Sequence, residues 1–363
     1  MASAIRILGC LIAVLALAAI GAAPAEGEEH VSLAYGSEIP TCPDRVLDVQ
    51  APRTPWYVRT DAVVLTRDAN RDVDIASFNA FPDVRGDVIL STRDVDFPFQ
   101  LGPRILIGRT INECYQVEGS YFDLAQSDDS AAVGDLPSRL SSPFTGFGDP
   151  AHPGYFALHN IFDFNYFASV RITSYLRNAE INLRRALPMP PGRAAASFLI
   201  GMRYMGISEG FEYLTKSVDT TNFIRVDTGN ELLGAQIGAM MEFYKEDCWW
   251  INFEAKGAIC QNSANQHTTL TQAFAGGARV DFPNAVSKNG TAFVGDLALT
   301  VLYRWGEHLA ARFGYQAIWV DRLALAADNF STDYGILIAG PAQLRRDATV
   351  VYHGPFAGLE LAW

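Results

Sequence analysis

Beyond its first two dozen residues, the sequence lacks any apolar run long enough to cross a membrane as a helix, which takes about 20 apolar residues. The one long apolar segment, Ile7 to Ala23, follows Arg6 and ends among small residues, a pattern typical of a secretory signal peptide. We therefore predict a signal peptide over residues 1–25. The mature chain is then either a soluble exported protein or one that crosses a membrane as strands.

Cysteine is scarce, with five in 363 residues, and Cys10 falls inside the predicted signal peptide. The other four, Cys42, Cys114, Cys248 and Cys260, form no Cys-x-x-Cys pair, which argues against zinc and thioredoxin-like sites. Export permits disulfides, and Cys42, Cys114 and Cys248 all fall at the predicted periplasmic end, so a Cys42–Cys114 or a Cys114–Cys248 bridge is conceivable. Cys248 and Cys260 are expected at opposite ends of one strand and should not pair.

Positive charge is also in deficit, with 28 lysines and arginines against 40 aspartates and glutamates and a net charge of −12. An acidic exported chain is a poor candidate for nucleic-acid binding, so no nucleic-acid partner is predicted. The sequence has no Gly-rich phosphate loop and no metal-spaced His/Glu pair, so neither a cofactor nor a metal is predicted.

What the sequence has in abundance is alternation with a period of two. In 291–305 the odd positions carry mostly large apolar residues, whereas the even positions include Asp296 and Arg304. A β-strand places these two sets on opposite faces. The alternating segments run to roughly 9–14 residues, against about 5–6 for most strands, and transmembrane barrel strands need about 9–11.

The lengths of the connections favour a barrel. Short connections near 111–114, 188–194, 245–247 and 306–307 alternate with long polar ones at 67–100, 125–170, 261–290 and 323–347, as in barrels with short periplasmic turns and long outer loops. We predict an all-β fold, a transmembrane antiparallel up-and-down β-barrel with long outer loops over residues 54–363, preceded by a periplasmic lead-in at 26–53. The predicted strands lie near 55–66, 101–111, 114–124, 171–187, 195–214, 222–244, 248–260, 291–305, 308–322 and 348–363.

That prediction has about ten strands, with twelve as the alternative, because 86–96 and 265–280 could each add a hairpin partner. The last strand ends in an aromatic residue, which is typical of the segment that the barrel-assembly machinery captures by edge pairing. We predict that Gly358, Leu361 and Trp363 form this assembly signal.

Charged residues of both signs fall on the faces expected to point inward. They suggest either an ion-pair network that fills a small barrel or a constriction that conducts solutes. Barrels of about eight strands are filled by their own side chains and wide channels need about sixteen, so a filled or narrow lumen is favoured. The predicted lumen-lining residues are Glu118, Glu180, Arg184, Arg203, Glu242, Glu254, Lys256, Asp296, Arg304 and Arg312, with Arg59 and Asp61 on the same faces.

Several stretches resemble the beta-barrel porin-7 family of outer-membrane proteins. They are TPWYVRTDAVVLTRD (54–68), LGPRILIGRTINECYQVEGSYFDL (101–124), AEINLRRAL (179–187), FLIGMRYMGISEGFEY (198–213) and NELLGAQIGAMMEF (230–243). The resemblance extends from about residue 54 to 363. It implies a porin-like outer-membrane barrel and brings no catalytic residues.

We therefore predict a non-enzymatic, porin-like barrel in the bacterial outer membrane, with the lipid bilayer and the assembly machinery as partners. The sequence does not specify the number of subunits. Its role would be small-solute passage or a surface or structural function. One alternative is an outer-membrane enzyme with a loop-level site; Gly206-Ile-Ser208-Glu-Gly210 matches a hydrolase pattern, but no helix is predicted after it. The other is a soluble exported β-sandwich that acts as a binding module.

Overall fold

The computed structural model describes residues 56–68, 72–78, 86–112, 114–187, 195–246, 248–306, 308–340 and 343–363. The predicted signal peptide at 1–25 and the predicted lead-in at 26–53 lie outside the described residues. Among the described residues, no helix is long and apolar enough to cross a membrane.

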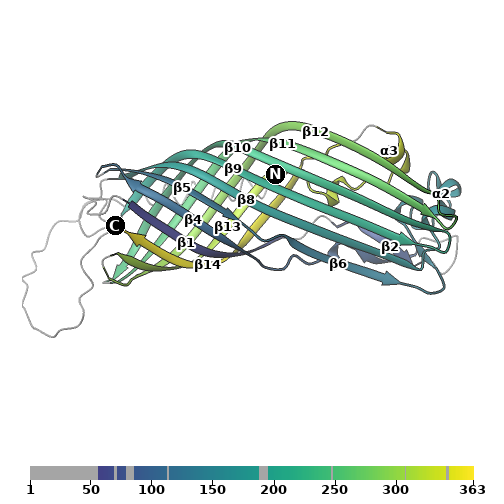
Figure 1. Ribbon diagram of the computed structural model, residues 1–363, viewed down its shortest axis with the longest axis horizontal. Helices are drawn as coiled ribbons and strands as arrows, with labels where there is room; N and C mark the ends of the chain where they lie inside the picture. The colour runs from purple at the N-terminus through teal and green to yellow at the C-terminus, as the bar shows by residue number, and fades with distance from the viewer. Residues whose placement is uncertain are drawn as a thin grey trace, which may run out of the picture. The chain divides into compact units, whose positions relative to one another are not determined.

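Within this part of the chain, ten antiparallel strands close into a ring (Figure 1). The sheet runs β5-β4-β1-β14-β13-β12-β11-β10-β9-β8, and β5 pairs back with β8. The strands are β1 (Trp56–Arg67), β4 (Gln100–Thr110), β5 (Tyr115–Asp123), β8 (Phe167–Leu187), β9 (Ala196–Lys216), β10 (Thr220–Glu246), β11 (Trp249–Phe274), β12 (Arg279–Arg304), β13 (Leu309–Leu323) and β14 (Ala348–Ala362). The predicted barrel of about ten strands is confirmed. The β-sandwich alternative is wrong, because the pairing of β5 with β8 closes the sheet on itself.

The twelve-strand alternative is also wrong. Residues 86–96 contribute β3 (Asp87–Ser91), which joins β2 (Asp74–Phe78) and β7 (Leu140–Ser141) in a separate small sheet. Residues 265–280 do not form an extra hairpin, because β11 continues to Phe274 and β12 begins at Arg279. The predicted outer loop at 261–290 is therefore a continuation of two ring strands.

The ring strands differ in length. The strands β8 to β12 have 21 to 27 residues, whereas β1, β4, β5, β13 and β14 have 9 to 15. The long strands continue past the short ones (Figure 1). β6 (Ser127–Gly134) pairs with β8 where β5 has ended. We call these outer parts of β8 to β12, together with β6, the outer sheet.

The two faces of the long strands exchange polarity along their length. Near the end of the ring that carries Trp56 and Trp363, which we expect to face the periplasm, outward residues are apolar and exposed, such as Ile181, Ile237 and Ile259 at 68%, 61% and 63%. In the outer sheet many of the outward residues are polar, and the inward ones include apolar residues that are fully buried, such as Ile224 and Leu270. Exposed apolar side chains are stable against lipid but not against water, so the exchange marks where the strands leave the bilayer. The stretch from Trp249 to Ile259 has the length of about 9–11 residues that a tilted strand needs to cross.

The inward face of the outer sheet is covered by the outer connections. They contain the helices η1 (Thr92–Asp94), η2 (Pro143–Thr145), α2 (Tyr155–Phe162), η3 (Ala327–Asn329) and α3 (Tyr334–Ile338). Phe144 and Phe162 stack with ring centres 4.4 Å apart, and Phe144 packs edge-on against Phe330 at 6.0 Å. The outer sheet therefore encloses an apolar core of the kind found in water-soluble proteins.

One outer connection turns into the ring. β13 has a bulge at Arg322, whose φ of 65° is left-handed. The residues after it, Leu323 to Ala327, are all buried, and we call them the closing segment. Asn230 on β10 holds this segment through two hydrogen bonds of 2.8 Å with the carbonyl and the amide of Ala324.

The cysteines correct the disulfide expectations. Cys248 is disulfide-bonded, while Cys114 and Cys260 are free. Both bridges that involve Cys114 are therefore wrong, and Cys248 does not pair with Cys260, as predicted. Cys42 lies outside the described residues.

Candidate functional site: a charged layer inside the barrel

The predicted lumen residues all lie at inward positions of ring strands. Ion pairs join seven of the ten to one another: Glu118, Glu180, Arg184, Arg203, Glu254, Lys256 and Asp296. Arg312 pairs instead with Asp61 and Glu360. Glu242 and Arg304 lie nearer the periplasmic end, where Glu242 is buried and the Arg304 guanidinium sits 5.0 Å from the ring centre of Trp250. The strand pattern thus placed these side chains, but it did not predict their partners.

Arg203 on β9 occupies the centre of the cluster. Its side chain is fully buried, and one terminal nitrogen donates to Glu180 and to Asp296 at 2.5 Å each. Asp296 lies on β12, so this contact passes over β10 and β11 and crosses the interior of the ring. Lys256 adds a second positive charge 3.0 Å from Glu180 and 3.3 Å from Asp296. Burial of a charge is costly unless it is paired, and here two carboxylates match two cations.

A second group of charges surrounds Glu118 on β5. Arg184 on β8 lies 3.0 Å from Glu118 and 2.6 Å from Glu254. The Tyr57 hydroxyl donates to Glu118 at 2.7 Å, and Arg59 lies 3.7 Å away. Glu118 is therefore held by side chains from two other strands, β1 and β8.

The remaining charges close the network around the ring. Arg104 on β4 pairs with Asp61 at 2.6 Å and donates to Gln316, which in turn donates to Asp296 at 2.8 Å. Arg312 lies 3.6 Å from both Asp61 and Glu360. Among the described residues the circuit contains six acidic and six basic side chains, which we call the charged layer: Asp61, Glu118, Glu180, Glu254, Asp296, Glu360, Arg59, Arg104, Arg184, Arg203, Lys256 and Arg312.

Two members of the charged layer were not predicted. Arg104 follows a glycine-proline pair at the start of its strand, and Glu360 lies close to the chain end. In both cases the neighbouring residues indicate that the side chain points inward. Ile105 and Ile107 point to lipid, which turns Arg104 inward, and the exposed Leu359 and Leu361 do the same for Glu360.

A cavity of about 70 Å³ lies within the charged layer, bordered by Asp61, Arg104, Arg312 and Gln316 among others. A buried water needs roughly 10–15 Å³ of such space, so several waters fit. The Arg312 Nε to Asp61 Oδ1 distance of 3.6 Å is too long for a direct hydrogen bond and suits a bridging water. The charged layer is therefore a narrow zone with room for water.

On the outer side of the charged layer the interior becomes apolar. Buried side chains from most of the ring strands pack here with the closing segment, and they include Leu65, Phe122, Leu176, Ile207 and Leu323. We call this zone the apolar layer. The expectation of a polar lumen thus holds only for the periplasmic part of the barrel, because the outer part is surrounded by water and buries its apolar residues inside.

The hydrolase-like pattern lies in the middle of a strand. Ser208 is exposed on the outward face of β9, which continues without interruption to Lys216. A nucleophile elbow requires a sharp turn from strand to helix, and β9 has none there. Among the described residues, no group of three or more His, Cys, Asp or Glu side chains is arranged to hold a metal ion.

The predicted assembly residues lie on the closing strand. β14 pairs with β1 to the end of the chain, where the amides of Trp363 and Trp56 each donate to the carbonyl of the other, at 3.0 and 3.2 Å. Leu361 and Trp363 are about half exposed on the outer face. Gly358 is constrained by packing, since a Cβ there would lie 2.1 Å from the Thr60 carbonyl oxygen and 2.3 Å from the carboxylate of Asp61.

Comparison with known proteins gives one family and several structures. The family model described as Putative beta barrel porin-7 (BBP7) matches residues 85–363. No curated protein matches the sequence. Similar solved structures include the CymD monoaromatic hydrocarbon channel (9% identity, TM-score 0.22, 86% of this chain and 89% of that one) and a FadL homologue of Pseudomonas aeruginosa (8%, 0.22, 85% and 89%). OmpT of Vibrio cholerae is also similar, with 9% identity, a TM-score of 0.14, and 86% and 100% of the two chains covered.

Proposed function

Since the chain belongs to the beta-barrel porin-7 family and is a porin-like barrel of the bacterial outer membrane, we propose that its lumen is filled by its own side chains and that it serves mainly as a membrane-anchored surface structure. In this proposal the periplasmic part of the barrel anchors the chain in the bilayer. The outer sheet and its connections then form the part that faces the surroundings of the cell.

The observation that carries the proposal is the position of Arg203. Its fully buried side chain joins Glu180 on β8 to Asp296 on β12 through the interior of the ring. A hydrated solute would have to separate these charges, and breaking a buried ion pair by removal of a partner costs about 3–5 kcal/mol. The charged layer therefore supports a closed lumen at the level of the bilayer.

The apolar layer supports the same conclusion independently. A polar solute that passed the charged layer would next meet Leu65, Phe122 and Leu323, whose side chains offer it no hydrogen bonds. Desolvating a polar group without replacement costs about 2–7 kcal/mol, depending on the reference state. Two barriers of different chemistry thus lie in series along the barrel.

A narrow conducting state is the second candidate function. It is favoured by the cavity of about 70 Å³ between Asp61, Arg104 and Arg312, where water already fits. In that case small ions would pass only when the closing segment moves aside. The enzyme alternative has no comparable support, because the hydrolase-like Ser208 lies on an uninterrupted strand.

Conductance across a planar bilayer tests the proposal. We expect a flat baseline from inserted protein, and insertion is verified in the same sample by the shift in gel migration that boiling produces in folded barrels. Regular current steps from the unaltered protein would contradict the filled lumen. If such steps appear, Lys256→Ala should change the ratio of cation to anion current in the narrow-pore alternative, since it removes a charge that lines the cavity.

A further inference from the structure

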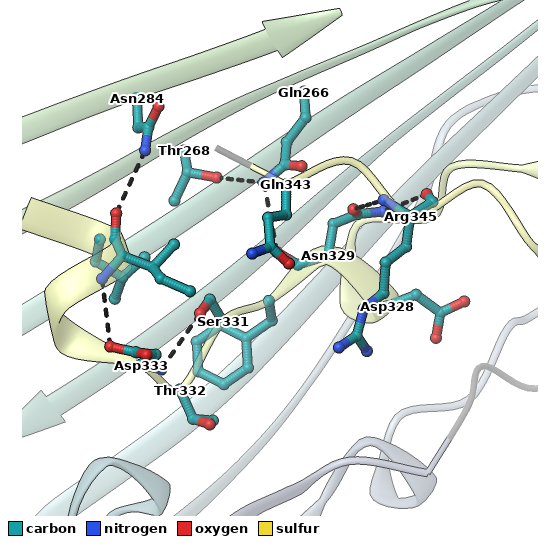
Figure 2. A pocket seen from close by; sticks show the side chains of 13 residues that line it. Gln266, Thr268, Asn284, Asp328, Asn329, Ser331, Thr332, Asp333, Gln343 and Arg345 are labelled. Carbon is teal, nitrogen blue, oxygen red and sulfur yellow. Dashed lines mark hydrogen bonds between the residues drawn. The ribbon is translucent and has the colours of Figure 1, made fainter. Parts of the chain in front are cut away.

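A pocket at the outer end of the barrel is not used by the proposed function. It lies between the inward faces of β11 and β12 and the connection from β13 to β14, with a volume of about 310 Å³ (Figure 2). Its polar lining comes from both sides and includes Gln266, Thr268, Ser331, Thr332, Gln343 and Arg345. This volume falls at the small end of the range for ligand pockets, about 300–1,000 Å³, so it suits a small molecule rather than a polymer.

Gln266 contributes a buried acceptor without a partner. Only 7% of the residue is exposed, and its amide nitrogen donates to the Thr268 hydroxyl at 2.9 Å and to the Asn329 carbonyl at 3.4 Å. These two bonds fix the orientation of the amide, and Gln266 is one of the residues that line the pocket in Figure 2. Among the described residues no donor reaches the amide oxygen. Leaving a buried acceptor unpaired costs free energy, which a ligand that donates a hydrogen bond would recover.

The wall opposite Gln266 is held in place before any ligand binds. The side chain of Asn329 bridges the two ends of the connection, donating to the carbonyls of Leu325 at 2.8 Å and Arg345 at 3.1 Å and accepting from the Arg345 amide at 2.8 Å. Asn284 on β12 donates to the carbonyl of Gly340 at 3.1 Å. A site held in this way loses little entropy on binding.

The chemistry of the lining indicates a neutral ligand. The strand side is made of amide and hydroxyl groups that carry no charge: Gln266, Thr268 and Asn284. The charged side chains that line the pocket, Asp328, Asp333 and Arg345, carry both signs and all lie on the connection. Apolar surface from Phe330 and other residues adds a patch that can contact C–H groups. Such a mixture of paired donors and acceptors with a hydrocarbon patch complements a sugar ring.

We propose that this pocket binds a small, neutral, hydroxyl-rich molecule of the mono- or disaccharide class. One ligand hydroxyl donates to the Gln266 amide oxygen, and others face the hydroxyls of Ser331 and Thr332 and the amide of Gln343. The pocket is on the outer side of the apolar layer, so binding does not depend on whether the barrel conducts. A failure of this proposal is therefore distinguishable from a failure of the filled lumen.

The test uses the full-length protein in detergent micelles and saturation-transfer NMR with D-glucose, D-galactose and maltose as probes. Glucuronate and glucosamine serve as charged analogues. We expect at least one neutral sugar to bind in the millimolar range or tighter, about −4 kcal/mol or better, and to bind more strongly than its charged analogues. Absence of neutral-sugar binding up to about 10 mM, or binding of the charged analogues alone, would overturn the proposal.

Substitutions locate the binding. Gln266→Met keeps the size of the side chain and removes the acceptor, and we expect it to weaken sugar binding at least tenfold. Gln261→Met is the matched control, because Gln261 is exposed on the outward face of the same strand. If Gln266→Met fails to show heat-modifiable migration, Thr332→Val with Gln343→Leu tests the other wall. Equal binding by the folded pocket variant and the control would contradict the assignment.

Discussion

Arg67 on β1 and Glu209 on β9 form an ion pair in which neither side chain is exposed. The strands β4, β5 and β8 separate them around the ring, so this pair, like Arg203 with Asp296, crosses the interior. Glu209 also accepts a hydrogen bond of 3.1 Å from the amide of Ala326. One carboxylate thus connects two strands of the ring to the closing segment.

Glu209→Ala should destabilise the barrel and release the closing segment. It leaves the buried Arg67 without this partner, and breaking a buried ion pair costs about 3–5 kcal/mol. The free energy of unfolding in urea should fall by that order, and the Ala326 amide should exchange its hydrogen faster. Glu212→Ala is the control on the outward face of β9, where we expect a loss within about 1 kcal/mol. An equal loss in both variants would contradict the role assigned to Glu209.

Arg203→Lys should behave as a disruptive substitution despite keeping the charge. The planar guanidinium reaches Glu180 and Asp296 together, whereas an ammonium group is a point charge on a flexible stem. We expect the free energy of unfolding of Arg203→Lys to be lower than that of the unaltered protein, and that of Arg203→Met to be lower still. Arg185→Met, which changes an outward-facing arginine, should remain within about 0.5 kcal/mol of the unaltered protein. Unchanged stability of both Arg203 variants would contradict a stabilising role for the ion pairs of Arg203 with Glu180 and Asp296.

Gly358→Ala should impair closure of the barrel between β14 and β1. A Cβ at this position would overlap the Thr60 carbonyl oxygen, which belongs to the backbone and cannot simply turn aside. Slower appearance of the heat-modifiable form during refolding in detergent is the expected result. Refolding requires no assembly machinery, so this packing effect is separable from the proposed assembly signal.

Trp363→Ala tests the assembly signal itself. We propose that the machinery recognises the terminal aromatic residue, so this variant should reach the outer membrane in smaller amounts while refolding normally in detergent. Trp305→Ala is the control, because Trp305 is an exposed aromatic residue next to the end of β12 but is not part of the signal. Equal membrane levels of the two variants would argue against recognition of Trp363.

Packing of the outer connections should depend on pH through Asp163. This buried carboxylate accepts hydrogen bonds from the Ser142 amide and the Thr145 hydroxyl, yet desolvation raises its pKa to about 6. The unfolded value is about 3.9, so the protonated form is favoured in the folded state. The associated stability is fully present below about pH 4 and is lost as the pH rises through about 6, a change of roughly 3 kcal/mol at most.

Hydrogen exchange at the Ser142 amide, corrected for the intrinsic rate, should therefore show less protection at pH 8 than at pH 4. Asp163→Asn keeps the accepting oxygen and removes the charge, so its protection should be nearly constant over the same range. If protection of the Ser142 amide in Asp163→Asn still changed with pH as in the unaltered protein, a group other than Asp163 would be responsible.

The sequence predicted the ring well because lipid on one side and charge on the other make the alternation strong. It failed for the outer sheet, where this contrast disappears. In β11 beyond Cys260, the outward Gln261 and Ser263 and the inward Asn262 and Gln266 are all polar, so 261–290 resembled a loop. The strand nature of this stretch comes from pairing with β10, whose partners are distant in sequence.

The interior was predicted in part for a similar reason. Parity along a strand fixes which charges point inward, but the partner of each charge depends on the tilt and stagger of the strands. That is why Arg203 could be placed while its contact with Asp296 could not. The closing segment did have a signal, since Leu323-Ala-Leu-Ala-Ala327 is apolar within an otherwise polar connection.

The exchange of polarity along the long strands also protects the barrel against mispairing. If β10 slipped by one residue against its neighbours, Ile237 would turn toward the charged layer while Ile224 turned into water. A slip of one residue therefore costs free energy in two places. Inside the bilayer it brings apolar groups to the charged layer, and outside the bilayer it exposes apolar groups to water. The register of each long hairpin is therefore specified at two levels, whereas a strand confined to the bilayer has only one.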